Sequence, residues 1–296
     1  MTRKTRAEGV LLGLTMIWGS TFVVGKYVLL HVTPLQMIAV RFVLSTAFIL
    51  ALYSRRIFPL TRRQVARGGI LGILLFLGFV PQTIGLTLTT ASKSAFITGM
   101  MVVFVPLLQV VIERRWPKLG NIAGVAVVSV GLWLLTSPSG SSFNAGDALT
   151  LVCAVLFAVY IVYIDVVAHD MSAMQLTFLQ MATSAILAAG ASLAFDTLPP
   201  SVPAGTIVGI LYLTAFATIL TTFMQTRYQK ETTPTRAAII FTIEPVIAAL
   251  SAAAFLGEQI GVGGALGGGL IIGGVLISEL SDGIPFLKRQ LGPPDS

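Results

Sequence analysis

Charged residues are scarce in this chain of 296 residues. Asp, Glu, Lys and Arg together make up 10% of it, whereas hydrophobic residues make up 55% and the mean hydropathy is +0.89. A soluble domain carries roughly 25% charged residues, and a water-soluble domain of this size needs more polar surface than such a chain offers. The low charge content therefore excludes an ordinary soluble protein and favours a chain that is solvated by lipid.

Residues that bind metals or form disulfides are equally few. The chain has one cysteine, Cys153, and two histidines, His31 and His169. These numbers exclude an internal disulfide framework and a zinc site built from cysteines. His-Glu-x-x-His, Gly-x-Ser-x-Gly, Walker and paired-aspartate motifs are also absent from the sequence. We therefore expect no metal, no cofactor and no enzymatic activity, and we expect Cys153 to be a small buried residue.

Long apolar runs fill most of the chain. A bilayer core of about 30 Å needs about 20 apolar residues per helix. The run that begins at Gly9 is too long for the apolar region of a signal peptide, and we expect it to be retained as the first helix. The sequence thus predicts an all-α polytopic membrane protein whose ten transmembrane helices cover residues 9–30, 35–53, 67–88, 93–112, 119–136, 147–168, 171–194, 204–226, 234–256 and 260–280.

Basic residues separate cleanly between the predicted connections. If the N-terminus is cytoplasmic, sixteen of the nineteen Lys and Arg residues lie on the cytoplasmic side and only Lys93 lies outside, while Lys26 and Arg41 fall within spans. Such a distribution is what the positive-inside rule describes. It predicts that both termini are cytoplasmic, and it explains the net charge of +7 by membrane orientation rather than by nucleic-acid binding.

The two halves of the sequence match at a constant shift along the chain. This shift places Trp18 on Phe157, Arg41 on Gln180 and Pro106 on Pro245, and glycines in the last span of each half match at a slightly larger shift. Because five spans per half is an odd number, the second half must insert upside down. We expect a first repeat at residues 1–140 and a second, inverted repeat at residues 141–296. Transport sites in such proteins lie near the midplane, between the halves.

Three motifs resemble those of EamA-type drug/metabolite transporters. They are Trp18-Gly19-Ser20-Thr21-Phe22, Arg41-Phe42, and Glu244-Pro245-Val246 followed by Leu256-Gly257-Glu258. The resemblance covers nearly the whole chain and implies a ten-helix carrier that exports small metabolites, as YddG-type exporters do with aromatic amino acids. Two departures, Pro117-Lys118-Leu119 in place of a Gly-Glu pair and Phe157-Ala158 in place of Trp-Gly, leave the substrate open.

Three of the ionisable groups within the predicted spans are candidates for the transport site, because a charge there is costly unless it faces a cavity or a partner. Lys26 either contributes to a cationic patch or extends to the membrane interface. Arg41 either meets a substrate carboxylate, pairs with Glu258 or caps a helix end. Glu244, in the middle of its span, is a proton-titrating site, a ligand for a substrate ammonium group, or a structural hydrogen-bond acceptor.

The remaining candidates for a central cavity are polar, aromatic or flexible residues on the first four helices of each half. Pro81, Pro106 and Pro245 are candidates for interrupted helices, or for kinks that only shape packing. Glycines on the fifth and tenth helices favour close helix packing outside the cavity, or dimerisation. The complete set of predicted cavity residues is Trp18, Ser20, Arg41, Gln82, Met101, Tyr160, Tyr163, Gln180, Tyr212, Phe241 and Glu244.

The function that these features favour is export of amino acids with apolar or aromatic side chains by a secondary transporter of the cell membrane. A carrier of drugs, organic cations, nucleosides or other metabolites is the alternative, and an enzyme, a channel or a scaffold fits less well. The expected partners are a small-molecule substrate and the lipid bilayer, with no nucleic acid and no ATPase subunit. Direction, coupling ion and the choice between monomer and dimer stay open.

The distribution of basic residues generates the first testable prediction. A green fluorescent protein fused to the C-terminus should fluoresce, and alkaline phosphatase fused there should be inactive, because the C-terminus is cytoplasmic. The same reporters inserted between His31 and Pro34, a predicted external connection, should give the reverse pattern. An active phosphatase at the C-terminus contradicts the predicted topology.

Overall fold

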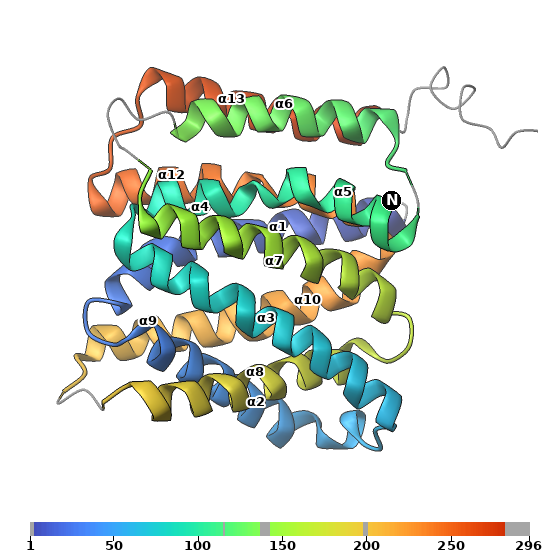
Figure 1. Cartoon of the computed structure of the whole chain (residues 1–296), viewed down its shortest axis with the longest axis vertical. Coiled ribbons are helices and arrows are strands. Elements are labelled where there is room, and N and C mark those ends of the chain that lie inside the picture. Colours follow the sequence, from blue (N-terminus) through green and yellow to red (C-terminus); the bar gives the residue numbers. More distant parts are fainter. Residues whose placement is uncertain (1–2, 115, 137–142, 198–200, 282–296) are drawn as a thin grey trace, which may run out of the picture.

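The computed structural model describes residues 3–114, 116–136, 143–197 and 201–281, and this part of the chain is helical without a strand. The helices run roughly parallel and antiparallel through one bundle (Figure 1). In chain order they are α1 (Arg3–Val28), α2 (Pro34–Ile57), α3 (Arg62–Leu88), α4 (Ala91–Gly99), α5 (Met101–Glu113), α6 (Leu119–Thr136), α7 (Ala145–Val167), α8 (Ala173–Phe195), α9 (Ala204–Thr214), the π-helix η1 (Ala215–Leu220), α10 (Thr221–Tyr228), the short 3-10 helix η2 (Gln229–Glu231), α11 (Pro234–Phe241), α12 (Ile243–Leu256) and α13 (Val262–Ser281).

These elements form the ten predicted spans. Eight stretches of the described chain are long and apolar enough to cross a membrane, and two shorter apolar stretches, Leu119–Leu134 and Val262–Ser278, supply the others. α1 begins at Arg3 rather than at Gly9, because hydropathy marks the apolar segment and not the end of the helix. Capping boxes begin four of the other described helices: Thr33, Thr61, Asn144 and Ser172 each bond reciprocally with a Gln or Asp three residues on.

Interruptions of the helices do not coincide with the prolines. The fourth span breaks at Met100, between α4 and α5, and the ninth breaks at Thr242, between α11 and α12. Pro245 lacks the N–H that would bond the Phe241 carbonyl, and the N–H of Thr242 bonds the carbonyls of Ile239 and Ile240. Of the two alternatives for these prolines, an interrupted helix is absent at Pro81 and Pro106, since α3 and α5 run unbroken through them. The loss of one helical bond is tolerated at each.

The shift between the halves changes part of the way along each repeat. The caps of α2 and α8, Thr33 and Ser172, follow the shift that relates the first spans, whereas the caps of α4 and α11, Thr90 and Thr233, are further apart in the sequence. The cause is the connection to the third span: residues 58–61 join α2 to α3, whereas the longer segment 196–203 joins α8 to α9.

We call the shift along the sequence that relates Thr33 to Ser172 the short offset, and the larger shift that relates Thr90 to Thr233 the long offset. The short offset relates the first two spans of each half, and the long offset relates the later spans. The two differ by about one helical turn. The predicted equivalence of Pro106 and Pro245, which used the short offset in the fourth span, is therefore wrong by about one turn.

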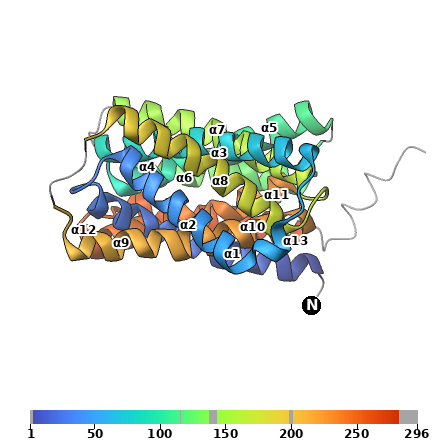
Figure 2. The ribbon, with the colours of Figure 1, turned by 90° about the horizontal axis from the view of Figure 1, so that it is seen from below.

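The two halves interlock through their first helices. α1 packs against α9, α10, α11 and α12 of the second half, and α7 packs against α3, α4 and α5 of the first. The fifth helix of each half, α6 or α13, packs mainly against the other, and the pair lies at one edge of the bundle (Figure 1). In the view from below, α2 and α8 lie nearer to the viewer than this pair (Figure 2). The repeat boundary expected between residues 140 and 141 lies outside the described residues.

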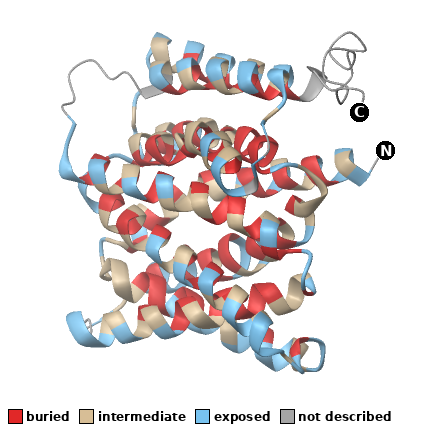
Figure 3. Cartoon of the chain, turned by 45° about the vertical axis from the view of Figure 1, so that its right-hand side comes forward, coloured by how far each residue is buried: buried red, intermediate tan, exposed pale blue. Residues whose placement is uncertain are grey.

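The outer surface of the bundle is apolar. Large hydrophobic side chains such as Leu193, Phe255 and Ile186 are more than 70% exposed, and exposed residues follow the outward faces of the helices while buried ones face inward (Figure 3). A soluble protein rarely leaves so many large apolar groups in water. The surface therefore matches a hydrocarbon solvent, and the chain is a multi-pass membrane protein.

The contact between α6 and α13 generates the second prediction. A Cβ at Gly274 would lie 2.6 Å from Val128 Cγ2 and 2.9 Å from the Gly124 carbonyl oxygen, whereas a Cβ at the neighbouring Gly273 would meet nothing within 4 Å. Gly274→Ala should lower the free energy of unfolding by about 1–3 kcal/mol, since the helices cannot separate without losing contacts. Gly273→Ala is the matched control and should be neutral or slightly stabilising. Thermal unfolding in detergent measures both; equal melting temperatures contradict the close approach.

Candidate functional site

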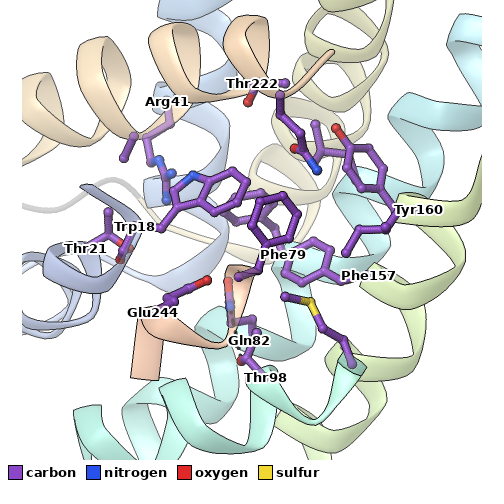
Figure 4. Close-up of a pocket in the computed structure, with 16 residues that line it drawn as sticks. Trp18, Thr21, Arg41, Phe79, Gln82, Thr98, Phe157, Tyr160, Thr222 and Glu244 are labelled. Atoms are coloured by element: carbon purple, nitrogen blue, oxygen red, sulfur yellow. Dashed lines mark hydrogen bonds between the residues drawn. The ribbon is translucent and has the colours of Figure 1, made fainter. Parts of the chain in front are cut away.

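A cavity lies in the middle of the bundle, between the two halves. The cavity and the open solvent at its mouth together make up about 630 Å³ that protein atoms do not fill. Both halves contribute side chains, and none of its described lining residues comes from α6, α8 or α13. The lining residues, most of which are labelled in Figure 4, are Trp18, Thr21, Arg41, Leu75, Phe79, Gln82, Thr98, Met101, Phe157, Tyr160, Ile161, Ala217, Thr222, Gln225, Phe241 and Glu244.

Most of the lining consists of pseudo-equivalent pairs. With the short offset for the first span and the long offset for the third and fourth, twelve of the sixteen lining residues match another lining residue. The cavity is thus built from the same positions of both repeats. The pairs are Trp18 with Phe157, Thr21 with Tyr160, Phe79 with Thr222, Gln82 with Gln225, Thr98 with Phe241, and Met101 with Glu244.

Glu244 is the acidic group of the cavity. It lies in the first turn of α12, directly after the break at Thr242, and is only 7% exposed. Its carboxylate makes no hydrogen bond or ion pair with the residues that the structure describes. The free N–H groups at a helix N-terminus favour a negative charge, so the break provides a position for a carboxylate but no partner for it.

Arg41 is the basic group of the cavity. The side chain, 5% exposed, comes from α2, and its Nε and Nη2 donate to the Thr218 hydroxyl at 3.2 and 2.9 Å. The guanidinium also lies over the Phe79 ring, 5.0 Å from its centre. Thr218 belongs to the π-helix η1 and donates in turn to the Leu213 carbonyl at 2.8 Å. No carboxylate of the described chain pairs with Arg41.

Arg41 and Glu244 are therefore a basic and an acidic side chain that line the same cavity without pairing. In the close-up, Arg41 lies toward the top of the view and Glu244 toward the bottom, with the Trp18 side chain between them in projection (Figure 4). The alternative pairing of Arg41 with Glu258 is wrong. Glu258 instead accepts hydrogen bonds from the backbone N–H groups of Ala91 and Ser92 at the start of α4.

Aromatic rings form the apolar wall. Trp18 meets Phe241 edge to face at 5.2 Å, and its indole N–H donates to the Thr221 hydroxyl at 3.0 Å. Phe79 contacts Phe157 edge to face at 5.6 Å. Edge-to-face contact is a preferred arrangement of aromatic rings, and the wall presents an apolar surface next to Arg41 and Glu244.

The structure brings seven of the eleven predicted residues to this cavity: Trp18, Arg41, Gln82, Met101, Tyr160, Phe241 and Glu244. Ser20 and Tyr212 instead bond to each other at 2.7 Å, between α1 and α9. Gln180 lies behind the lining, where it accepts the Tyr160 hydroxyl at 2.7 Å and donates to Thr226 at 3.0 Å. Tyr163 is half-buried against the hydrophobic core.

Lys26, the third ionisable residue, does not line the cavity. Its ammonium donates to the backbone carbonyls of Leu86 and Thr89 at the end of α3. A cation at a helix C-terminus meets unpaired carbonyl groups and the negative end of the helix dipole. The arrangement favours a structural role for Lys26 over a cationic substrate patch.

Nine lining residues were not among the predicted ones. Two signals in the sequence point to most of them: Leu75 and Phe79 precede Gln82 at helical spacing, and the repeat carries Trp18 to Phe157 and Gln82 to Gln225. The short offset hid the last equivalence, because it places Gln82 on the residue before Thr222. The nine are Thr21, Leu75, Phe79, Thr98, Phe157, Ile161, Ala217, Thr222 and Gln225.

Metal ligands are not grouped in the described part of the chain, which holds no cluster of three or more His, Cys, Asp or Glu side chains. Cys153, the single cysteine, is buried as expected. The chemistry that the cavity offers is binding: one cation, one anion, a few amides and hydroxyls, and an aromatic wall.

Comparisons with known proteins agree with this architecture. The family model of the EamA-like transporter family matches residues 6–137 and again residues 144–280, and the chain belongs to this family. An uncharacterized transporter of Archaeoglobus fulgidus is 32% identical over 93% of this chain and 88% of its own length. The uncharacterized transporter YyaM of Bacillus subtilis is 26% identical over 91% of this chain and 92% of its own.

A solved crystal structure shares the fold. It superposes with a TM-score of 0.77 over 98% of this chain and 100% of its own, at 17% sequence identity. The two matches of the family model cover one half of the chain each, so the two-repeat organisation and the membrane-transporter class rest on the family as well as on the helices. The special similarity to YddG-type exporters stays a prediction.

The lining of α10 generates the third prediction. In a Cys153→Ser background, Thr222→Cys should react with a small water-soluble methanethiosulfonate, because Thr222 faces the cavity. Thr226→Cys, one turn further along the same helix, should react about tenfold more slowly or not at all, because Thr226 is 1% exposed and bonded to Gln180. Mass spectrometry of the labelled protein measures both rates; equal rates contradict the cavity.

Proposed function

We propose that the chain is a secondary transporter that exports zwitterionic metabolites across the cell membrane, first among them amino acids with apolar or aromatic side chains. One observation carries this proposal. Arg41 and Glu244 are buried in the same cavity, and neither has a countercharge among the described residues. A zwitterion brings a carboxylate for Arg41 and an ammonium group for Glu244.

Electrostatics support a ligand with two charges. A buried charge is costly when it is unpaired, and its attraction to a partner is strong in a medium of low dielectric constant. A ligand that pairs both charges removes both penalties at once, whereas a neutral nucleoside removes neither. An organic cation pairs only Glu244, which makes it the second candidate.

Apolar contacts support a small amphipathic ligand. The rings of Trp18, Phe157 and Phe241 can pack on an apolar side chain, and the flexible Met101 can adapt to several of them. Phosphorylated substrates need several converging cations, and Arg41 is the single Lys or Arg among the described lining residues.

The inverted repeat supports alternating access around this cavity. Each half can adopt the conformation of the other, which opens the central site to one side and then to the other. The distribution of basic residues supports a cytoplasmic position for both termini. Glu244 can also carry a coupling proton, because a carboxylate without a partner can take up a proton at no loss of an ion pair.

The fourth prediction concerns recognition of the two charged groups. In proteoliposomes the wild type should transport leucine in preference to N-acetyl-leucine, which lacks the ammonium group, and to leucinamide, which lacks the carboxylate. In Glu244→Gln, the ratio of leucine transport to N-acetyl-leucine transport should fall about tenfold or more. In Arg41→Gln, the ratio of leucine transport to leucinamide transport should fall by a similar factor. Initial rates of counterflow with radiolabelled substrates measure these ratios.

Gly273→Ala, which changes a residue far from the cavity, is the control for reconstitution. A wild type that moves phosphorylated sugars but no amino acid contradicts the proposed cargo. If Glu244→Gln transports leucine at the wild-type rate from about pH 5 to about pH 8, Glu244 is neither an ammonium ligand nor a proton carrier. If it lowers transport of all three compounds equally, its role is structural.

A further inference from the structure

Among the described residues, two ion pairs with a buried carboxylate join the two halves of the bundle. At one of them, Glu8 of α1 pairs with Arg236 of α11, with 2.8 Å between Oε1 and Nε, and accepts from the Thr232 hydroxyl at 3.1 Å. At the other, Asp147 of α7 pairs with Lys93 of α4, with 2.6 Å between Oδ2 and Nζ, and accepts from the Thr89 hydroxyl at 2.8 Å. Each site consists of a carboxylate from one half and a cation with a threonine from the other.

The two sites are equivalent positions of the two repeats. Glu8 and Asp147 are related by the short offset, which also relates α1 to α7. Thr89 with Thr232, and Lys93 with Arg236, are each related by the long offset, which also relates α4 to α11. All three members of one site therefore occupy the places of the three members of the other.

The sites lie at opposite ends of the bundle. Lys26, near the end of α1, donates to the Thr89 carbonyl, and the Thr89 side chain donates to Asp147. Glu8 precedes Lys26 on the same unbroken helix by about five turns, which span about 27 Å. Trp18, which lines the cavity, lies between Glu8 and Lys26 on α1. One ion pair is thus on each side of the cavity.

Burial makes these contacts sensitive to separation of the helices. The side chains of Asp147 and Glu8 are 0% and 9% exposed, and that of Arg236 is 3% exposed. A buried ion pair that loses one partner leaves a charge without compensation, whereas helices that move apart let water replace the partner. Each contact therefore stabilises the packing of the helices at its end of the bundle for as long as water is excluded from it.

We propose that these two sites are alternating gates: the Glu8 site closes one end of the cavity, the Asp147 site closes the other, and each transport cycle opens them in turn. This proposal rests on the alternating access proposed above. In the present structure both contacts are formed, so both ends are held. Because the sites are equivalent positions of an inverted repeat, the movement that opens the Glu8 site corresponds to the movement that opens the Asp147 site at the other end.

The test measures access to the cavity and needs no substrate. The reporter is Thr222→Cys in the Cys153→Ser background, labelled with a membrane-impermeant methanethiosulfonate from either face of sealed vesicles. Glu8→Gln should speed labelling about tenfold from the face at which Glu8 lies and slow it from the other face. Asp147→Asn should do the opposite.

Further variants keep the result clear. Glu231→Gln removes a carboxylate whose ion pair with Arg227 lies within one half, and it should leave both rates unchanged. The exchange of Glu8→Arg with Arg236→Glu should restore the wild-type rates. If the charge variants do not fold, Thr232→Val and Thr89→Val remove only the hydroxyl donors and should shift access in the same opposite directions by about threefold.

Labelling that changes from the same face in both variants, or from neither face in folded protein, overturns the gates. This outcome is independent of the proposed cargo, because a gated cavity that transports no amino acid still shows the opposite shifts. Amino-acid transport without any shift keeps the proposed function and removes the gates.

Discussion

A charge inside a membrane needs a partner, and this requirement organises the whole bundle. At the ends of the helices it is met within the chain: Glu8, Asp147 and Lys26 all have hydrogen-bond or ion-pair partners on other helices. In the middle it is not met for Glu244 among the described residues, and Arg41 has only the Thr218 hydroxyl and the Phe79 ring there. The ends are thus fastened by internal contacts, while the centre is left with charges for a ligand to pair.

The repeat explains why the cavity is nearly symmetric, and the charges are what make it asymmetric. Most lining residues occur as pseudo-equivalent pairs, but Glu244 is matched by Met101 and Arg41 by the uncharged Gln180 behind the lining. A cavity with identical ends would suit a symmetric ligand. Arg41 in the first half and Glu244 in the second half give the cavity two different ends. Such a cavity suits a molecule with an ammonium group and a carboxylate.

Sequence was enough for the fold but not for all of the cavity. Apolar runs predict the ten spans, because lipid imposes a simple pattern on helices, although α1 and α3 begin before the predicted starts at residues 9 and 67. The short offset failed after the second helix of each half, where the segment 196–203 is longer than its counterpart 58–61. The rotation of each helix about its axis determines which of the remaining candidates reach the cavity. Ser20 and Tyr212 are as suitable in sequence as Trp18 and Tyr160, yet the side chains of Ser20 and Tyr212 face each other between α1 and α9.

Binding of a zwitterion between Arg41 and Glu244 can be measured directly through Trp18, which lines the cavity. With Trp116→Phe and Trp133→Phe, both at exposed positions, the fluorescence of purified protein reports on Trp18 alone. Leucine should change this fluorescence in a saturable manner, and N-acetyl-leucine and leucinamide should each bind about tenfold more weakly or worse. Equal affinity for all three compounds, or no response to any amino acid in a folded protein, contradicts a site that pairs both charges.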